Sequence, residues 1–366
     1  MQKMSKSKIK YYDIRDDIKL YPDAWCYLIW SKRGPGKTYS SLRMMIEDKE
    51  KFIFMKRTQE DVRLLCARIS IPGVAGTSDD ISPFAPLNRD FGWSIYPFEI
   101  EKGLAGFYEA VIDEDGKLKP IGACLGWIIA CSAVTKFKGF NMDANYIIFD
   151  EFIPKPWDRV NRTEGDSVMD LYETISRDRV KRGKGELKLI CLANATSLNN
   201  PMFNTLEVGD YAAEMDILGR EYTYLETGVL LHYIQGNFDQ DENTKKTGIQ
   251  RHMEGTAWGA MAYGGHFGYN DFTSIGRTSL KGYRPVCAVD YKRDHYFIYQ
   301  KEGNFYMTHS KHDSENFYNL NRENDQKKFA IDYVYDLRMA CIEGKMIFET
   351  FTMYDLIVNY KKFFSL

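Results

Sequence analysis

In the first two hundred residues, short apolar runs alternate with stretches of helical periodicity. Each run has four to six residues that are apolar at successive positions, with Lys188 as the one charged exception. This pattern is typical of strands that are buried on both faces of a sheet. The candidate strands are residues 25–30, 52–55, 126–131, 146–149 and 187–192. Strands that alternate with helices favour a largely parallel sheet with crossover helices, so we expect an α/β fold.

Three other stretches depart from this alternation. Residues 71–122 interrupt it, and an Asp115-Gly116 turn between apolar segments predicts a β-hairpin on an insertion. Periodicity then weakens as glycine and polar residues collect, which predicts a connector. The last hundred residues predict a small α+β or α/β domain, with strands at 286–291, 295–299 and 304–309 and helices over 329–346 and 353–364. The predicted divisions are 1–206, 207–270 and 271–366.

The composition excludes several classes of protein. The longest near-continuous apolar run, 121–131, has eleven residues, against the roughly 20 that a membrane helix needs. The seven cysteines form no C-x-x-C pair, so we expect reduced core thiols in an intracellular protein, with neither a disulfide framework nor a zinc site. A net charge of −2 argues against coating nucleic acid through general positive charge. A DNA partner would have to be held locally.

A phosphate-binding motif follows the first predicted strand. The run Ser31-Lys-Arg-Gly-Pro-Gly-Lys-Thr38 lies between that strand and a helical stretch over 39–48, the context of a P-loop. Gly34 and Gly36 let backbone N–H groups close around phosphates, Lys37 reaches the β and γ oxygens, and the Thr38 hydroxyl ligates Mg²⁺. Ser31 stands where the motif usually has its first glycine. The alternative is a glycine turn with a chance Gly-Lys-Thr.

Two adjacent acids follow the strand at 146–149. In a parallel sheet they would lie at the carboxyl edge and face the phosphate loop. Asp150 can hold Mg²⁺, and Glu151 can polarise a water for attack on the γ-phosphate. A solvated loop start is the alternative. The additional predicted strand at 126–131 and this glutamate together indicate a P-loop ATPase with an extra strand and a catalytic glutamate, rather than a nucleotide kinase or small GTPase.

Other side chains are candidates with open alternatives. Asn194 follows the strand at 187–192, at the same edge of the sheet, and either contacts the attacking water or γ-phosphate or serves as a turn residue or helix cap. A basic cluster at 177–188 is either a solvated helix end or the source of an arginine finger, for which Arg177 is the best candidate. Lys155, Arg159 and Arg162 are spaced to contact a phosphate backbone or lie in solvent. Tyr11 and Tyr12 either stack on adenine or pack in the core.

These motifs resemble the DNA-encapsidation ATPases of small tailed phages with protein-capped linear genomes, a group similar to the large-terminase ATPases. The resemblance rests on the loop from Arg33 to Thr38, on Ile-Phe-Asp-Glu-Phe-Ile at 148–153, and on Ile-Cys-Leu-Ala-Asn-Ala at 190–195 with Asn200-Pro201 after it. Weaker similarity continues through 251–261.

The resemblance implies a motor that uses ATP and Mg²⁺ to drive double-stranded DNA into a procapsid. Its partners would be the portal and other copies of this chain in a ring, which we expect to be a pentamer, with a structural RNA as a further candidate. The protein would act in the host cytoplasm, transiently attached to the procapsid vertex. The implied nucleotide-binding residues are Arg33, Gly34, Gly36, Lys37, Thr38, Tyr39 and Asp150; Thr38 and Asp150 would hold the metal, and Glu151, Lys37, Arg177 and Asn194 would serve catalysis.

The core of this fold would be RecA-like, and the last domain would resemble a ribonuclease H-like nuclease. Nuclease chemistry needs clustered carboxylates for two metals. Asp290 ends one predicted strand without partner acids at comparable positions, so we expect a binding domain without nuclease activity. The competing functions are a P-loop helicase or nucleotide kinase-like enzyme, and a non-catalytic scaffold suggested by Ser31.

Overall fold

The computed structural model divides the chain into two compact units, which we describe separately. The first comprises residues 1–206 and 214–269, and the second comprises 207–213 and 270–366. The structure describes residues 11–70, 78–137, 142–155, 157–158, 160–177, 179–235, 247–259, 262–263, 265, 267, 270 and 272–364. Among these residues, no helix is both long and apolar enough to cross a membrane.

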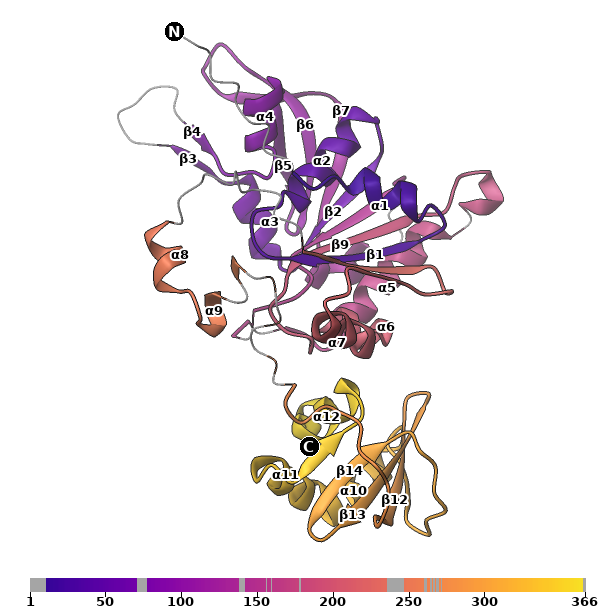
Figure 1. Ribbon diagram of the computed structural model, residues 1–366. Helices are drawn as coiled ribbons and strands as arrows, with labels where there is room; N and C mark the ends of the chain where they lie inside the picture. Colours follow the sequence, from indigo (N-terminus) through magenta and orange to yellow (C-terminus); the bar gives the residue numbers. More distant parts are fainter. Residues whose placement is uncertain are drawn as a thin grey trace. The chain divides into compact units, whose positions relative to one another are not determined.

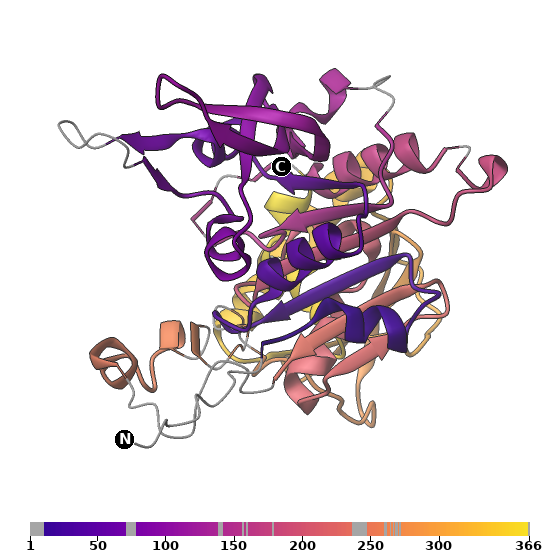
Figure 2. The same ribbon diagram turned by 90° about the horizontal axis from the view of Figure 1, so that it is seen from above.

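The first unit is built on a nine-stranded sheet (Figures 1 and 2). Its order is β10-β11-β1-β9-β8-β2-β7-β6-β5. The central strands are β1 (Cys26–Ser31), β2 (Phe52–Lys56), β7 (Leu118–Ala130), β8 (Tyr146–Asp150), β9 (Lys188–Asn194) and β11 (Val229–Ile234), and neighbours among them pair in parallel. The five strands expected from the apolar runs are thus confirmed. They are almost wholly buried, as expected for strands covered on both faces.

Helices connect and flank these strands. Those of the first unit, with α7 shared between the units, are α1 (Ile14–Leu20), α2 (Lys37–Glu47), α3 (Gln59–Cys66), α4 (Ala85–Phe91), α5 (Glu164–Ser176), α6 (Pro201–Leu206), α7 (Gly209–Leu218), α8 (Gly248–His252) and α9 (Ala257–Gly259). Short 3₁₀ turns cover Cys131–Phe137 and Val180–Arg182. In a parallel sheet with crossover helices, ligands bind at the ends of the strands, where the connecting loops lie, and not on the faces of the sheet.

The predicted hairpin is confirmed within the insertion. Strands β5 (Ile95–Glu101) and β6 (Leu104–Ile112) extend the sheet in antiparallel pairing, β6 with β7 and β5 with β6. The β6–β7 turn is closed by Asp113, whose N–H donates to the Lys117 carbonyl and whose carboxylate accepts from the Lys117 N–H. The segment at 126–130 is the end of the long strand β7. A small pair, β3 (Arg68–Ser70) and β4 (Ser78–Asp80), lies outside the main sheet.

Two features differ from the sequence prediction. The strand that lies between β1 and β8 in space is β9, whereas residues 126–130 lie beyond β2. The segment predicted as a connector also supplies β11 and the antiparallel edge strand β10 (Tyr222–Tyr224) to the sheet. The polar His232 in β11 weakened the apolar signal there. Its ring is buried and bonds to the buried Asp17 carboxylate at 2.7 Å, so the strand tolerates it.

The second unit has a five-stranded sheet of order β15-β12-β13-β14-β16. An antiparallel meander, β12 (Arg284–Tyr291), β13 (Asp294–Lys301) and β14 (Asn304–Thr308), confirms the three predicted strands, and β15 (Phe317–Asn319) and β16 (Met346–Phe348) pair in parallel at its edges. Met346 is therefore in a strand, where a helix was predicted. The helices are α10 (Glu323–Phe329), a π-helical turn (Ala330–Val334), α11 (Tyr335–Ile342), α12 (Phe351–Val358) and α13 (Tyr360–Phe364).

Candidate nucleotide site

The loop between β1 and α2 is shaped to hold phosphates. Gly34 and Gly36 have φ values of 100° and 92°, a left-handed conformation that glycine adopts without strain. Gly36 is the N-cap residue of α2, so the free N–H groups and the positive end of the helix dipole face the loop. A pocket of about 300 Å³ opens here. It is lined by residues 33–39 of the loop and helix, by Asp150 and Glu151, and by Leu192, Ala193 and Asn194.

Lys37 is the first residue of α2, and its ammonium group lies in this pocket. Its Nζ donates to Ser31 Oγ at 2.5 Å and lies 3.4 Å from Asn194 Oδ1. Burial lowers the pKa of Lys37 to about 8, although the nearby Asp150 carboxylate acts in the opposite direction. Ser31, the irregular position of the motif, thus supplies a hydroxyl that holds the lysine.

Two oxygen ligands suited to Mg²⁺ meet at the next position. The Thr38 hydroxyl donates to Asp150 Oδ1 at 2.8 Å, which joins the start of α2 to the end of β8. Hydroxyl and carboxylate oxygens are the donors that this hard cation prefers. The donor set therefore fits a magnesium ion, and the two residues predicted to hold it lie within hydrogen-bonding distance of each other.

Glu151 follows at the carboxyl edge of the sheet with an unusual backbone. Its φ is 59°, a left-handed conformation that is uncommon for a residue other than glycine. Its side chain is 64% exposed and belongs to the lining of the pocket. Such strain is often stored at functional sites. The four residues Lys37, Thr38, Asp150 and Glu151 therefore surround one pocket.

Sequence reasoning missed Lys56, the last residue of β2. Its Nζ lies 3.0 Å from Asp150 Oδ2 and 3.5 Å from Glu151 Oε2, so it bridges the two acids. Burial opposes its charge, but the attraction of Asp150 and Glu151 prevails and raises the pKa of Lys56. One feature of the sequence could have identified Lys56: it directly follows the predicted strand at 52–55, and so lies at the carboxyl edge of the sheet with Asp150 and Glu151.

The neighbouring Arg57 was missed as well. It donates through Nη2 to the carbonyl oxygens of Glu151 and Phe152 at 2.9 and 3.1 Å, and it pairs through Nε with Glu164 Oε2 at 2.8 Å. Glu164 is buried, and burial raises the pKa of its carboxyl while Arg57 counteracts that effect. Arg57 therefore ties the backbone of Glu151 to the first turn of α5.

The structure brings three more predicted residues to the pocket. Asn194 ends β9 beside Ser31 on β1, and its amide oxygen faces Lys37. Tyr39 lines the pocket from α2, and its hydroxyl donates to Asp90 Oδ2 at 3.0 Å. Arg33 is exposed at the mouth of the loop.

Arg177 lies elsewhere in the unit. It follows α5, two residues before Arg179, which is anchored to the Ala144 carbonyl and to Asn145 at the amino end of β8. β8 has five residues at about 3.3 Å each, so Arg177 is roughly 15 Å from the carboxyl edge. Its side chain is exposed and forms no ion pair within the described part of the chain. Lys155 and Arg162 follow Glu151 outside the pocket lining, and Arg159 lies outside the described residues.

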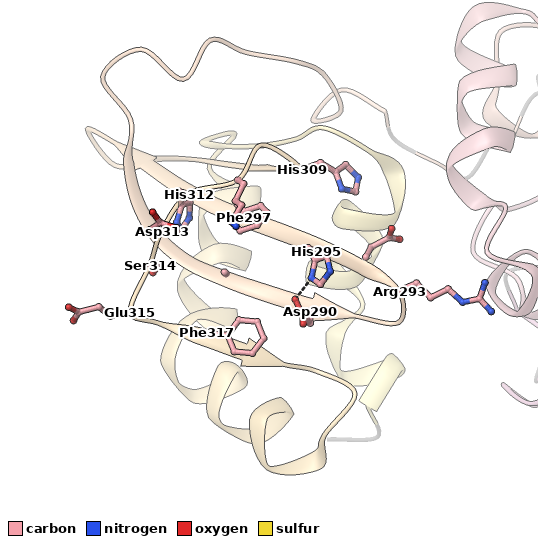
Figure 3. A pocket seen from close by; sticks show the side chains of 13 residues that line it. Asp290, Arg293, His295, Phe297, His309, His312, Asp313, Ser314, Glu315 and Phe317 are labelled. Atoms are coloured by element: carbon pink, nitrogen blue, oxygen red, sulfur yellow. Dashed lines mark hydrogen bonds and ion pairs between the residues drawn. The ribbon is translucent and has the colours of Figure 1, made fainter.

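A larger cavity, about 1050 Å³, occupies the second unit (Figure 3). It lies over Ala288 and Asp290, which alternate along β12 with the buried core residues Cys287 and Val289. Asp290 Oδ1 pairs with His295 Nδ1 at 2.6 Å. The described residues contain no group of three metal-binding side chains.

The order of the sheet and the pocket together define a class. One strand, β9, separates the phosphate-loop strand β1 from β8, and β8 ends in an aspartate followed by a glutamate. This is the arrangement of P-loop NTPases with an additional strand and a catalytic glutamate. Within that class, the chain belongs to the podovirus DNA encapsidation protein (Gp16) family, whose profile matches residues 114–358, about two thirds of the sequence.

Individual proteins and solved structures are also similar to this chain. The chain is 27% identical over 270 residues to the DNA packaging protein of Bacillus phage B103, covering 71% of this chain and 69% of that protein. It also shares its fold with the Phi-28 gp11 DNA packaging motor, with a TM-score of 0.58, 18% identity, and coverage of 97% and 98% of the two chains. The ATPase domain of the Thermus phage P74-26 large terminase aligns over 67% of this chain and 89% of that domain, with a TM-score of 0.33 and 10% identity.

Proposed function

We propose that this protein is the ATPase of a DNA-packaging motor, which couples ATP hydrolysis to the movement of double-stranded DNA into a procapsid. The observation that carries the proposal is the convergence of Lys37, Thr38, Asp150 and Glu151 on one pocket at the carboxyl edge of the sheet. Membership of the encapsidation family supplies the substrate and the setting. Host cytoplasm, with transient attachment to the portal vertex, follows from that setting.

The residues of the pocket have different roles in the proposed reaction. The loop N–H groups and Lys37 would bind the β- and γ-phosphates, and Thr38 and Asp150 would hold Mg²⁺. When bound, the metal ion neutralises charge on the phosphate oxygens. Glu151 orients the attacking water and accepts its proton. Asn194 faces Lys37 beside this position, so it can transmit the state of the γ-phosphate to β9.

A second copy of the chain would complete the site. Arg177 and the pocket lie at opposite edges of the same sheet, so an arginine finger must come from a neighbour. An association of one edge with the opposite edge is head-to-tail, and such contacts form a ring when the rotation between neighbouring copies closes. We therefore propose a ring, pentameric as in the expectation from sequence, that contacts DNA, the portal and, as a further candidate, a structural RNA.

Replacement of Glu151 by Gln tests the proposal. The amide keeps the shape of the side chain but accepts no proton, so we expect Glu151→Gln to bind ATP and to hydrolyse it about 10²- to 10⁴-fold more slowly. The measurement is phosphate release in the presence of duplex DNA. Glu226→Gln, an exposed glutamate at the β10–β11 turn, is the matched control and should keep the wild-type rate. Equally slow hydrolysis in wild type and Glu151→Gln, with ATP bound by both, would refute an ATPase role, whereas equally fast hydrolysis would refute Glu151 as the catalytic base.

A further inference from the structure

An exposed tyrosine lies against the phosphate loop. The Tyr11 side chain is 47% exposed, yet its ring contacts the loop so closely that a Cβ atom on Gly36 would lie 3.2 Å from Tyr11 Cδ1. Its neighbour Tyr12 is 4% exposed and packs in the core, so the two adjacent tyrosines have different roles. Core packing accounts for Tyr12 and leaves Tyr11 unexplained.

The backbone that carries Tyr11 is fixed at several points. The Tyr12 N–H donates to the Pro35 carbonyl of the loop at 2.9 Å. The Tyr12 hydroxyl donates at 2.6 Å to Asp17, which is fully buried in α1. Arg15 then binds Glu47 and Asp48 at the end of α2, at 2.9 and 3.1 Å. The segment that carries the Tyr11 ring beside Gly36 is therefore already ordered, so binding a ligand against this ring costs little further conformational entropy.

Tyr39 supports this ring from the helix. The two ring centroids are 5.9 Å apart with an interplanar angle of 33°. Tyr39 is held from behind by its hydrogen bond to Asp90 and by Phe91, whose ring centroid is 6.5 Å away. Burial and the bond to Asp90 raise the pKa of Tyr39 to about 12, so it is neutral at physiological pH. Tyr39 lines the pocket, which places the aromatic pair at the rim of the phosphate site.

We propose that Tyr11, supported by Tyr39, is the surface on which the base of the bound nucleotide stacks. The inference rests on the proposed function, because it requires a nucleotide whose phosphates occupy the loop. An exposed aromatic ring that is already ordered offers stacking energy to any base. Stacking favours the larger rings, so this surface selects purine over pyrimidine nucleotides and discriminates weakly between adenine and guanine.

Calorimetric titration with Mg²⁺ and three ligands tests this assignment: ADP, CDP and pyrophosphate, which has no base. For Tyr11→Ala we expect ADP affinity to fall about 5- to 150-fold, CDP affinity to fall less, and pyrophosphate affinity to stay within twofold. Tyr11→Leu, which keeps an apolar contact with Gly36, should show nearly the same loss. Tyr11→Trp should retain ADP binding. Tyr224→Ala, which removes a tyrosine that is 40% exposed on the edge strand β10, should change nothing.

Two results would overturn the assignment. If ADP and pyrophosphate affinities fell together, Tyr11 would merely support the loop through Gly36. If ADP affinity were unchanged in both Tyr11→Ala and Tyr11→Leu, the base would bind elsewhere. Failure of the wild-type protein to bind either ADP or pyrophosphate would instead refute the proposed function, and the stacking site with it.

Discussion

At the scale of single residues, burial in the pocket disfavours the charged form of Lys37. Lys37 is 8% exposed, and its pKa falls to about 8 because few solvent contacts remain. In the protein without nucleotide, Lys37 is charged below that pH and loses its proton as the pH rises through it. Only the charged form attracts phosphate strongly, so nucleotide affinity is linked to pH.

We therefore expect ADP affinity to fall as pH rises from 8 to 9.5, approaching tenfold per unit. Titration of ADP at a series of pH values measures this dependence. Lys37→Arg stays charged throughout this range and, although its binding is weaker at pH 7, should show a flat profile. An equal slope in both proteins would mean that another group titrates.

Lys56 and Lys51 provide a matched pair for stability. Both lysines form ion pairs near β2, Lys56 with Asp150 at 13% and 14% side-chain exposure and Lys51 with Asp143 at 65% and 42%. Removal of a buried partner leaves an uncompensated charge, so Lys56→Ala should lower the free energy of unfolding by about 2–4 kcal/mol. Lys51→Ala should cost less than about 1 kcal/mol. Denaturant unfolding measures both, and similar losses would contradict the burial argument.

Most of the pocket could be predicted from the sequence because its residues lie in short continuous segments. Residues 33–38 are contiguous, and Asp150 and Glu151 end a strand that its apolar pattern identifies. Lys56 and Arg57 were missed because their partners lie about a hundred residues away, and only the pairing of β2 with β8 brings them together. Contacts between strands that are distant in sequence carry no periodic signal.

At the scale of elements, the apolar pattern identified the strands but not which strands lie next to each other in the sheet. The apolar runs gave β1, β2, β8 and β9, whereas the position of β9 between β1 and β8 depends on packing of the whole sheet. β11 escaped notice because His232 is polar, and its partner Asp17 lies in a helix at the other end of the unit's sequence.

Gly126 shows how closely two of these elements pack. It pairs with Phe52 across β7 and β2, and a Cβ atom there would overlap the Phe52 ring. We expect Gly126→Ala to lower the free energy of unfolding by about 1–3 kcal/mol through overpacking. Gly185→Ala, where a Cβ meets no atom within 4 Å, should change it by less than about 0.5 kcal/mol. Thermal and denaturant unfolding of both variants test this difference.

At the scale of the whole molecule, the proposed arginine finger makes activity depend on a second copy of the chain, because Arg177 lies outside the lining of its own pocket. Under that proposal, an Arg177→Ala chain keeps an intact pocket but offers no finger to its neighbour, and a Glu151→Gln chain offers the finger but has an inactive pocket. Each variant alone should be nearly inactive. A mixture in equal amounts should regain up to about a quarter of the wild-type ATPase rate, because some Arg177→Ala pockets then lie beside an intact finger.

ATPase assays of the two variants, separate and mixed, measure this complementation. A finger acting within its own chain predicts no recovery on mixing. A mixture of Glu151→Gln with the Glu151→Gln, Arg177→Ala double variant controls for simple changes in protein concentration, and it should stay inactive.

The left-handed backbone at Glu151 has a consequence for how this sequence can change over generations. Glycine would relieve the strain there, stabilising the fold by about 1 kcal/mol, and would remove the carboxylate. Selection for abundant, well-folded protein alone would therefore drive this codon toward glycine. Under the proposed function, glutamate is kept at this position because its carboxylate activates the attacking water, at the cost of a less stable fold.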